Sequence, residues 1–255
     1  MILRVIRIEV DGVPRFAEAV EGGFMLFNRA PWLGGQPSGK RVAGGRLLAP
    51  VTPSKIIGIG ANYRDHALEM GKPLPLLPKV FLKPPTAVIG PDEAIRIPPG
   101  TVRVDHEAEL GVVIGARCHR VSAQDALGFV FGYTAVNDVT ARDFQKEDGL
   151  FARAKGFDSF CPVGPSVVAG LDPAALSVRC EVNGQIRQDG NTSDMVFPVS
   201  ELVAFVSNIM TLEPGDLITT GTPAGVGALR AGDEVIVRVQ GVGALKNTVQ
   251  DRDDR

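Results

Sequence analysis

The chain has 255 residues, of which 44% are hydrophobic and 22% charged, a composition typical of a globular protein with a substantial core. Its 27 basic and 29 acidic side chains give a net charge of −2, which excludes a general electrostatic attraction to nucleic acid or anionic lipid. No apolar run approaches the roughly 20 residues of a membrane span, and three scattered cysteines indicate neither a disulfide framework nor a zinc cluster. We therefore expect a cytoplasmic protein that binds neither nucleic acid nor membranes.

Residues 1–50 begin with short runs in which apolar and polar side chains alternate, and they end in a stretch rich in glycine and proline. The alternation predicts strands, and the stretch over 31–50 predicts a linker. We expect a small β-rich N-terminal subdomain with its linker over 1–50 and a catalytic domain over 51–255.

The rest of the chain contains many short strand patterns and few helical ones. The proline-rich segment 72–78 excludes regular structure, and Asn183-Gly184 between two strands predicts a hairpin. Apolar residues at helical spacing predict one clear helix at 199–210. Strands are expected at 55–60, 78–84, 94–98, 107–115, 128–139, 177–188, 216–221 and 234–249.

Two glycine-rich loops resemble nucleotide-binding sequences without matching them. GIGANYRD at 58–65 lacks the third glycine of a dinucleotide fingerprint, and prolines follow where a βαβ unit would need a helix. GTPAGVGAL at 221–229 lacks the Lys-Ser/Thr pair of a phosphate loop, which leaves a tight turn or a ligand-facing loop.

The segment VDHEAELGVVIG, 104–115, is the strongest indication of chemistry. On a strand Glu107 and Glu109 project from one face, and Asp138, at the end of the strand expected at 128–139, can supply a third carboxylate. Three carboxylates without a neighbouring His or Cys suit a hard divalent cation, Mg²⁺ or Mn²⁺. The alternative is a solvated strand edge, and Asp105 on the same face is a further candidate ligand.

Basic residues near this segment could balance its charge. Three carboxylates and one dication leave a net charge near −1, which repels an anionic substrate unless cations stand close. Arg142 can clamp a carboxylate through two hydrogen bonds, and Lys155 can act as a point charge or proton carrier. Taken alone, an Arg or a Lys is more often a surface residue, which is the alternative for each.

His66 and Glu69 lie three residues apart in a segment with helical character, so their side chains can meet. A His that a carboxylate holds in one tautomer is suited to be a general base for water. The alternative is an ordinary surface pair on a loop. Cys161 has no base near it in the sequence, which disfavours a thiol nucleophile.

Six segments occur in a characteristic order: NYRDHALEMG, PKVFLKPPTAVIGP, DHEAELGVVIG, GYTAVNDVTARDFQ, AKGFDSFCPVGP and NTSDMVFPVSELVAFVSNIMTLEPGDLITTGTPAGVG. Together they resemble the fumarylacetoacetate hydrolase family in its short bacterial branch, over residues 52–250. The resemblance implies an α+β, mainly β fold, a mixed β-sandwich roll that usually forms a homodimer.

The resemblance also implies roles for individual residues. It makes Glu107, Glu109 and Asp138 the ligands of Mg²⁺ or Mn²⁺. Larger members of the family carry a fourth, aspartate ligand where this chain has Ala61 and Asn62, so we expect three protein ligands. In similar proteins the ligand's carboxylate and 2-oxo group contact the positions of Arg142, Gln145, Lys155 and Thr222, while those of His66 and Glu69 form a dyad on a lid flanked by 73–78.

The resemblance implies a metal-dependent enzyme of aromatic catabolism that acts on 2-oxo or 2-hydroxy-diene dicarboxylic acids. We expect first a 2-hydroxyhepta-2,4-diene-1,7-dioate isomerase or decarboxylase, with Lys155 delivering a proton to the enolate carbon. The alternatives are an acylpyruvate or fumarylpyruvate hydrolase, in which His66 and Glu69 activate water for C–C cleavage, and an oxaloacetate decarboxylase. A non-catalytic protein that binds metal and small dicarboxylates is the alternative outside enzymes.

Overall fold

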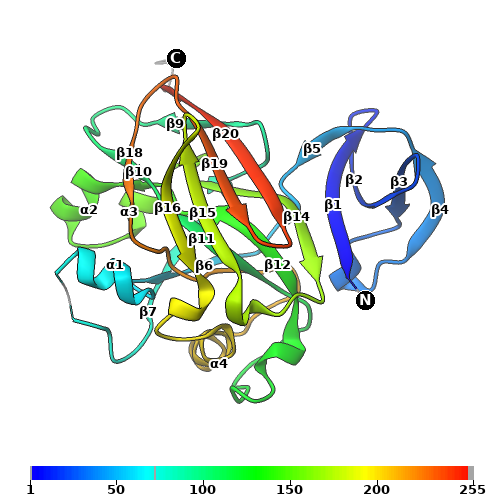
Figure 1. Ribbon diagram of the computed structural model, residues 1–255. Helices are drawn as coiled ribbons and strands as arrows, with labels where there is room; N and C mark the ends of the chain where they lie inside the picture. The colour runs from blue at the N-terminus through cyan, green and yellow to red at the C-terminus, as the bar shows by residue number, and fades with distance from the viewer. Residues whose placement is uncertain (1, 72, 252–255) are drawn as a thin grey trace.

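The computed structural model describes residues 2–71 and 73–251. Within them strands dominate and form three sheets, with four short α-helices at their edges (Figure 1). The expected α+β, mainly β fold is therefore confirmed. None of the helices in this part of the chain is long and apolar enough to cross a membrane.

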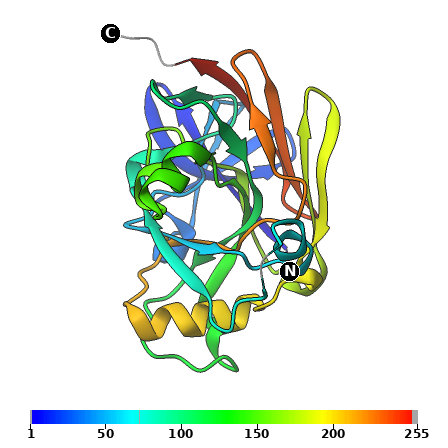
Figure 2. The same ribbon diagram turned by 90° about the vertical axis from the view of Figure 1, so that its left-hand side faces the viewer.

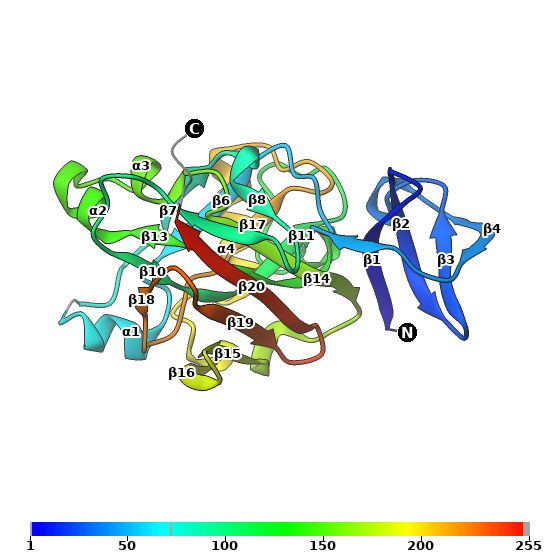
Figure 3. The ribbon, with the colours of Figure 1, turned by 90° about the horizontal axis from the view of Figure 1, so that it is seen from above.

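The N-terminal strands lie at one end of the molecule and have a small core of their own (Figure 3). They are β1 (Leu3–Val10), β2 (Val13–Val20), β3 (Gly23–Phe27), β4 (Pro37–Val42) and β5 (Arg46–Leu48). The linker prediction for 31–50 is therefore partly wrong, because β4 and β5 lie inside it. An edge strand such as β4 tolerates proline and glycine. The division at residue 50 stays a prediction, because β1 also pairs with β14 of the main sheet.

The largest sheet has the strand order β4-β3-β2-β1-β14-β12-β11-β17-β6-β7, with β5 on β1 and β8 on β14. It is mixed, since β17 and β6 are parallel whereas β11 is antiparallel to both of its neighbours. Its strands beyond the N-terminal part are β6 (Ile56–Gly60), β7 (Lys79–Lys83), β8 (Val88–Ile89), β11 (Ala108–Ile114), β12 (Val130–Asn137), β14 (Cys161–Ala169) and β17 (Leu217–Thr219).

Two smaller sheets complete the strand framework. The five-stranded sheet contains β16 (Gln185–Asn191), β15 (Ser177–Val182), β19 (Glu234–Val239), β20 (Gly243–Asp251) and β9 (Ala94–Ile97), in that order. The three-stranded sheet contains β13 (Thr140–Ala141), β10 (Val104–His106) and β18 (Gly227–Leu229). The hairpin expected at Asn183-Gly184 joins β15 to β16, and both turn residues have positive φ, 52° and 74°.

Helices occupy the periphery. The predicted amphipathic helix is α4 (Val199–Ile209), which buries Val199, Leu202, Val203 and Val206. The helices α1 (Arg64–Glu69), α2 (Arg142–Asp148) and α3 (Ala152–Lys155) lie on the side that faces the viewer in Figure 2. Single 3₁₀ turns lie at Pro31–Leu33, Pro85–Ala87, Ala126–Phe129, Pro173–Ala175 and Thr192–Asp194.

Strand β14 was not expected from the sequence. Pro162 and Pro165 weaken its pattern, because proline cannot donate to a sheet ladder. The pairing with β12 shifts register between Tyr133 and Ala135, opposite this proline-containing segment. The irregularity lets β14 join the N-terminal strands to the rest of the sheet.

Alternation along β11 separates the main core from the side that carries the charges. Leu110 and Val112 pack into the core shared with the five-stranded sheet, whereas Val113 packs into a second cluster on the opposite face. Glu109 shares the face of Val113, because side chains two and four residues apart point the same way along a strand. The acidic side chains thus leave the sheet on the face away from the main core.

Candidate active site

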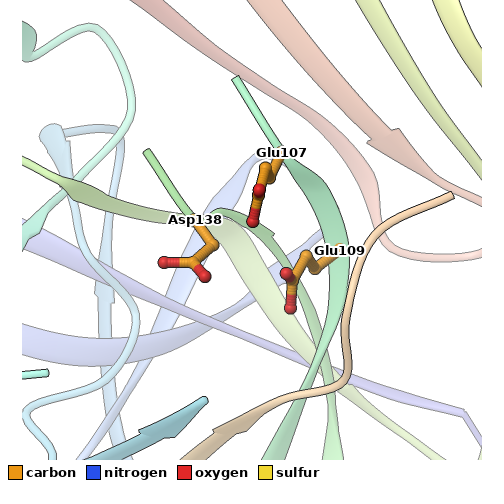
Figure 4. A group of neighbouring side chains, drawn as sticks. All are labelled: Glu107, Glu109 and Asp138. Carbon is orange, nitrogen blue, oxygen red and sulfur yellow. The ribbon is translucent and has the colours of Figure 1, made fainter. Parts of the chain in front are cut away.

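Three carboxylates converge at one end of the β11–β12 pair. Glu107 lies between β10 and β11, Glu109 is in β11, and Asp138 directly follows β12. The antiparallel register sets Ala108 opposite Asn137, which places Asp138 beside the two glutamates (Figure 4). One carboxylate oxygen from each of the three lies within 4.8 Å of the others.

These acids are buried, with only 6% of Glu107 and 1% each of Glu109 and Asp138 exposed. The alternative of a solvated strand edge is therefore wrong. Buried carboxylates need compensating positive charge or hydrogen bonds, because the low dielectric of the interior strongly disfavours isolated anions. The surroundings of the three acids must supply that compensation.

Two buried lysines supply part of it. Lys155, the last residue of α3, donates from Nζ to Glu107 Oε2 at 2.8 Å, to Asp138 Oδ2 at 2.5 Å and to Thr140 Oγ1 at 2.8 Å. Lys83, from β7, donates from Nζ to Asp138 Oδ1 and, at 2.7 Å, to the carbonyl of Phe160. Asp138 is thus held between two ammonium groups.

Arg142 supplies the third cation from the start of α2. Its Nη2 donates to Glu107 Oε1 at 2.5 Å, its Nε to Asp105 Oδ2 at 2.9 Å and its Nη1 to Gln145 Oε1 at 3.0 Å. Asp105 also accepts two hydrogen bonds from Arg103, at 2.8 and 3.0 Å. Both oxygens of Asp105 thus pair with guanidinium groups, and Asp105 is not among the three carboxylates that converge within 4.8 Å.

The charge balance of the cluster differs from the expectation. Three carboxylates face three cations, Lys83, Lys155 and Arg142, so the cluster is neutral by count before any ion binds. A dication would raise the count to +2 rather than leave −1. Such a site attracts an anion, and a dianion most strongly.

Burial and neighbouring charges move the pKa values of the two glutamates in opposite directions. Burial alone would raise the pKa of Glu107, but the charges of Lys155 and Arg142 hold it at about 2. Burial, together with the negative charges of Asp138 and Glu107, raises the pKa of Glu109 well above its usual range. Burial alone would lower the pKa of Lys155, but Asp138 and Glu107 raise it above its usual value.

The donor set fits a hard divalent ion. It consists of carboxylate oxygens, the ligands that Mg²⁺ and Mn²⁺ prefer. Glu109 Oε2 accepts the N–H of Gly221 at 2.8 Å, while Oε1 accepts no hydrogen bond from any described residue. A side chain at Gly221 would disturb this loop, because its Cβ would lie 2.8 Å from that of Asn62 and its φ is +90°.

The His–Glu pair expected at α1 is present. His66 Nδ1 lies 3.1 Å from Glu69 Oε2, and His66 is only 5% exposed, which excludes an ordinary surface pair. Glu69 Oε1 also accepts the N–H of Gly225 at 3.1 Å, and Asp65 Oδ2 accepts that of Ala224 at 3.2 Å. These hydrogen bonds connect α1 to the loop after β17. The role of this segment as a lid stays a prediction.

One cavity of about 400 Å³ brings most of the predicted residues together. Asp138 and Glu69 do not line it. Each contacts a lining residue instead, Asp138 through Lys155 and Glu69 through His66. The cavity is lined by Ile59, Gly60, Ala61, His66, Ala67, Met70, Lys79, Glu107, Glu109, Arg142, Gln145, Lys146, Gly149, Phe151, Lys155, Gly221 and Thr222.

Thr222 lines the cavity, but its hydroxyl is already engaged. It donates to the carbonyl of Ala108 at 2.8 Å and accepts from Gln188 Nε2 at 2.7 Å. Gln188 Oε1 in turn accepts the N–H of Ala108 and lies 3.0 Å from His106 Nδ1. The Thr222 hydroxyl therefore has no proton left for a ligand and retains only acceptor capacity.

Cys161 is unsuited to nucleophilic catalysis. The residue is fully buried in β14, and burial raises the pKa of its thiol to about 12. The reactive thiolate is therefore negligible at neutral pH. The structure agrees with the sequence in disfavouring a thiol mechanism.

Residues 55–250, most of the chain, match the model of the fumarylacetoacetate hydrolase C-terminal domain. The chain belongs to the fumarylacetoacetate hydrolase family. The family resemblance noted in the sequence is thereby confirmed, and its signature segments supply the carboxylate cluster and the lysine and arginine around it.

Members of the fumarylacetoacetate hydrolase family with solved structures superpose on nearly the whole chain. A 5-carboxymethyl-2-hydroxymuconate delta-isomerase from Mycobacterium smegmatis is 42% identical, with a TM-score of 0.91 over 98% of this chain and 100% of that one. A 2-hydroxyhepta-2,4-diene-1,7-dioate isomerase from Mycobacterium marinum is 42% identical, with a TM-score of 0.90 over 99% and 100%. The mitochondrial oxaloacetate tautomerase fahd2 of Xenopus laevis is 45% identical over 80% of this chain and 68% of its own.

Lys83 is the main site residue that the sequence did not reveal. The sequence pattern predicts it only as part of a strand at 78–84. The signal was present, since Lys83 shares a strand face with Phe81, and a charged residue on an apolar face points to a buried partner. Its partner, Asp138, comes from a distant strand and could not be inferred from spacing.

Proposed function

We propose that the chain is a Mg²⁺- or Mn²⁺-dependent enzyme that acts on 2-oxo or 2-hydroxy-diene dicarboxylic acids of aromatic catabolism. Its first candidate activity is that of a 2-hydroxyhepta-2,4-diene-1,7-dioate isomerase or decarboxylase. The observation that carries the proposal is a single cavity lined by Glu107, Glu109, Arg142, Lys155 and His66. The two isomerases at 42% identity support this choice of reaction.

Each group of the site has a distinct task in this proposal. Glu107, Glu109 and Asp138 would hold the ion. When bound, the ion would supply positive charge that stabilises the negative charge developing on the 2-oxo oxygen. Because Lys83, Lys155 and Arg142 already balance the three carboxylates, the bound ion would leave the site with a net positive charge that attracts a dicarboxylate.

The side chains around the ion would bind the substrate and move its proton. Arg142 uses three of its five N–H groups within the protein, which leaves two for a substrate carboxylate. Lys155 already donates all three of its protons, to Glu107, Asp138 and Thr140. Proton delivery by Lys155 therefore requires that it release one of these contacts.

His66 would act as the base. Its Nδ1 is engaged by Glu69 Oε2 at 3.1 Å, so Nε2 is the ring nitrogen left for a group in the cavity. Abstraction of a substrate proton by His66 and return of a proton by Lys155 would together give isomerisation. The His66–Glu69 pair also favours the second candidate, an acylpyruvate or fumarylpyruvate hydrolase, in which His66 would activate water.

A substrate panel tests the proposal. We expect the protein with Mg²⁺ to convert 2-hydroxyhepta-2,4-diene-1,7-dioate faster than acetylpyruvate, fumarylpyruvate or oxaloacetate, as followed by the absorbance of the enol or diene. Chelation of the metal should stop the reaction, and added Mn²⁺ should restore it. Hydrolysis of acetylpyruvate with no conversion of the dienedioate would identify a hydrolase and reject the first candidate. Selective conversion of oxaloacetate would reject both.

Replacement of His66 by alanine separates the reactions further. Hydrolysis and isomerisation should fall by about 10²- to 10⁴-fold, the range of a positioned general base, whereas decarboxylation should persist in part because it needs no base. The matched control is His119→Ala, because His119 is exposed and outside the cavity. Isomerisation at an undiminished rate in His66→Ala would remove His66 from the mechanism.

A further inference from the structure

We propose that Lys79 and Lys146 bind the distal carboxylate of the substrate and so select dicarboxylates over monocarboxylates. The inference rests on the proposed function, in which the 2-oxo acid end of the substrate lies at the carboxylate cluster. Both lysines line the same cavity as Glu107 and Glu109. Their positions along β7 and α2 place them away from that cluster.

Strand β7 forms one wall. Lys79, Phe81 and Lys83 alternate onto one face of it. Lys83 contacts Asp138, and the ring of Phe81 has its centroid 5.1 Å from Lys155 Nζ. Because a strand advances about 3.3 Å per residue, the Cα of Lys79 lies about 13 Å along β7 from that of Lys83. Lys79 is therefore displaced along β7 from the lysine that contacts Asp138.

Helix α2 forms another wall of the cavity. Like β7, it carries one cation that contacts the acids and a lysine further along the element. Arg142, Gln145, Lys146 and Gly149 recur at the spacing of one helical face, and all four line the cavity. Lys146 lies four residues after Arg142, about 6 Å further along the helix axis. Arg142 contacts Glu107, so Lys146 is displaced from the acids toward the far end of the cavity.

Both ammonium groups are available to a ligand. Among residues 2–71 and 73–251, neither lysine forms an ion pair or a side-chain hydrogen bond. The acids next to Lys146 on α2 are engaged elsewhere, since Glu147 and Asp148 contact Arg153 at 2.8 and 2.5 Å. Asp143 accepts the hydroxyl of Thr101 at 2.5 Å.

Apolar residues line the same cavity. They include Ile59, Ala67, Met70 and Phe151. A cavity that combines two separate groups of cations with apolar lining matches a ligand with a carboxylate at each end of a hydrocarbon chain. A 2-oxo or 2-hydroxy-diene dioate has this form, whereas an acylpyruvate with a methyl terminus offers nothing to Lys79 and Lys146.

Two ligands that differ only in the distal group test the inference. Binding of 2-oxoheptanedioate and 2-oxoheptanoate would be measured by calorimetry with Mg²⁺ present, in the wild type and in the double variant Lys79→Gln/Lys146→Gln. The wild type should prefer the dioate, and the double variant should lower that preference about tenfold, as expected for two partly exposed ion pairs. Both lysines are exposed, so the variant should keep its melting temperature.

Lys40→Gln/Arg41→Gln is the matched control. Both residues are exposed on β4 among the N-terminal strands, so this variant removes two positive charges away from the cavity, and its preference should equal that of the wild type. The inference is overturned if the double variant keeps the wild-type preference or if the wild type shows none. In either case, binding of both 2-oxo acids would still support the proposed function. Failure of both ligands and of oxalate to bind overturns both proposals.

Discussion

The double substitution Glu107→Gln/Glu109→Gln should abolish turnover of every 2-oxo acid and lower the affinity for Mn²⁺ by at least about a hundredfold. Loss of an outer hydrogen-bond partner of a metal ligand already costs 10- to 100-fold, and this variant removes two of the three candidate ligands themselves. It also leaves Lys83 and Lys155 around Asp138 and takes the Glu107 partner from Arg142, which gives a surplus of positive charge that opposes a cation. Mn²⁺ binding would be measured by electron paramagnetic resonance and turnover by the substrate panel.

The variant should still fold, because glutamine has the shape of a protonated glutamic acid. Its melting temperature should fall, because Glu107→Gln removes the ionised partner of the buried Lys155 and of Arg142. Burial and the neighbouring carboxylates raise the pKa of Glu109 well above its usual range, so Glu109→Gln removes a charge that its surroundings disfavour. A matched control is Glu18→Gln/Glu21→Gln, which removes two charges from the N-terminal strands and the turn that follows them, away from the cavity. Retained Mn²⁺ binding in a folded Glu107→Gln/Glu109→Gln protein would refute the metal assignment.

Replacement of Lys155 by methionine should lower kcat by about 10²- to 10⁴-fold, the range for loss of a positioned proton donor. Methionine keeps much of the side-chain volume but has no donor for Glu107, Asp138 and Thr140. Breaking a buried charge cluster typically costs about 3–5 kcal/mol, so the melting temperature should also fall. Mn²⁺ binding should persist, because the carboxylates are unchanged.

Lys83→Met distinguishes proton transfer from loss of charge. Lys83 contacts Asp138 as Lys155 does, but it does not line the cavity. We expect Lys83→Met to share the loss of stability, while its kcat at saturating metal stays well above that of Lys155→Met. Equal losses of kcat in the two variants would show that Lys155 acts through its charge alone and would reject proton transfer by Lys155.

Local patterns were enough to predict most of the strands. The runs that became β7, β9, β11, β12 and β15–β20, other than β18, showed alternation or continuous apolar character, and the Asn-Gly turn fixed the hairpin at 183–184. Strand β14 was missed because its two prolines argue against a strand, and β4 and β5 because glycine and proline suggest a linker. Those strands form because neighbouring strands in the sheet pair with their backbone hydrogen-bonding groups. The local sequence pattern carries no information about which strands those neighbours are.

The site shows the same division. Spacing alone placed Glu107 and Glu109 on one strand face and His66 beside Glu69, and the structure brings each pair together. The sequence pattern offered Asp138, Arg142 and Lys155 as candidates, and the family resemblance assigned them roles in one site. Neither source revealed that Lys83 holds Asp138 or that Arg103 and Arg142 occupy Asp105. Lys83 with Asp138 and Arg142 with Asp105 are contacts between segments far apart in the sequence, which local spacing does not indicate.

By itself the sequence determined which residue types were available and in what local order: acids two apart on a strand, a His and a Glu one helical turn apart, and apolar faces for a β core. Only the tertiary structure decided the charge of the site. Three cations from β7, α2 and α3 meet three carboxylates in a buried cluster, and Coulomb energies at such short range depend on distances that no sequence spacing fixes.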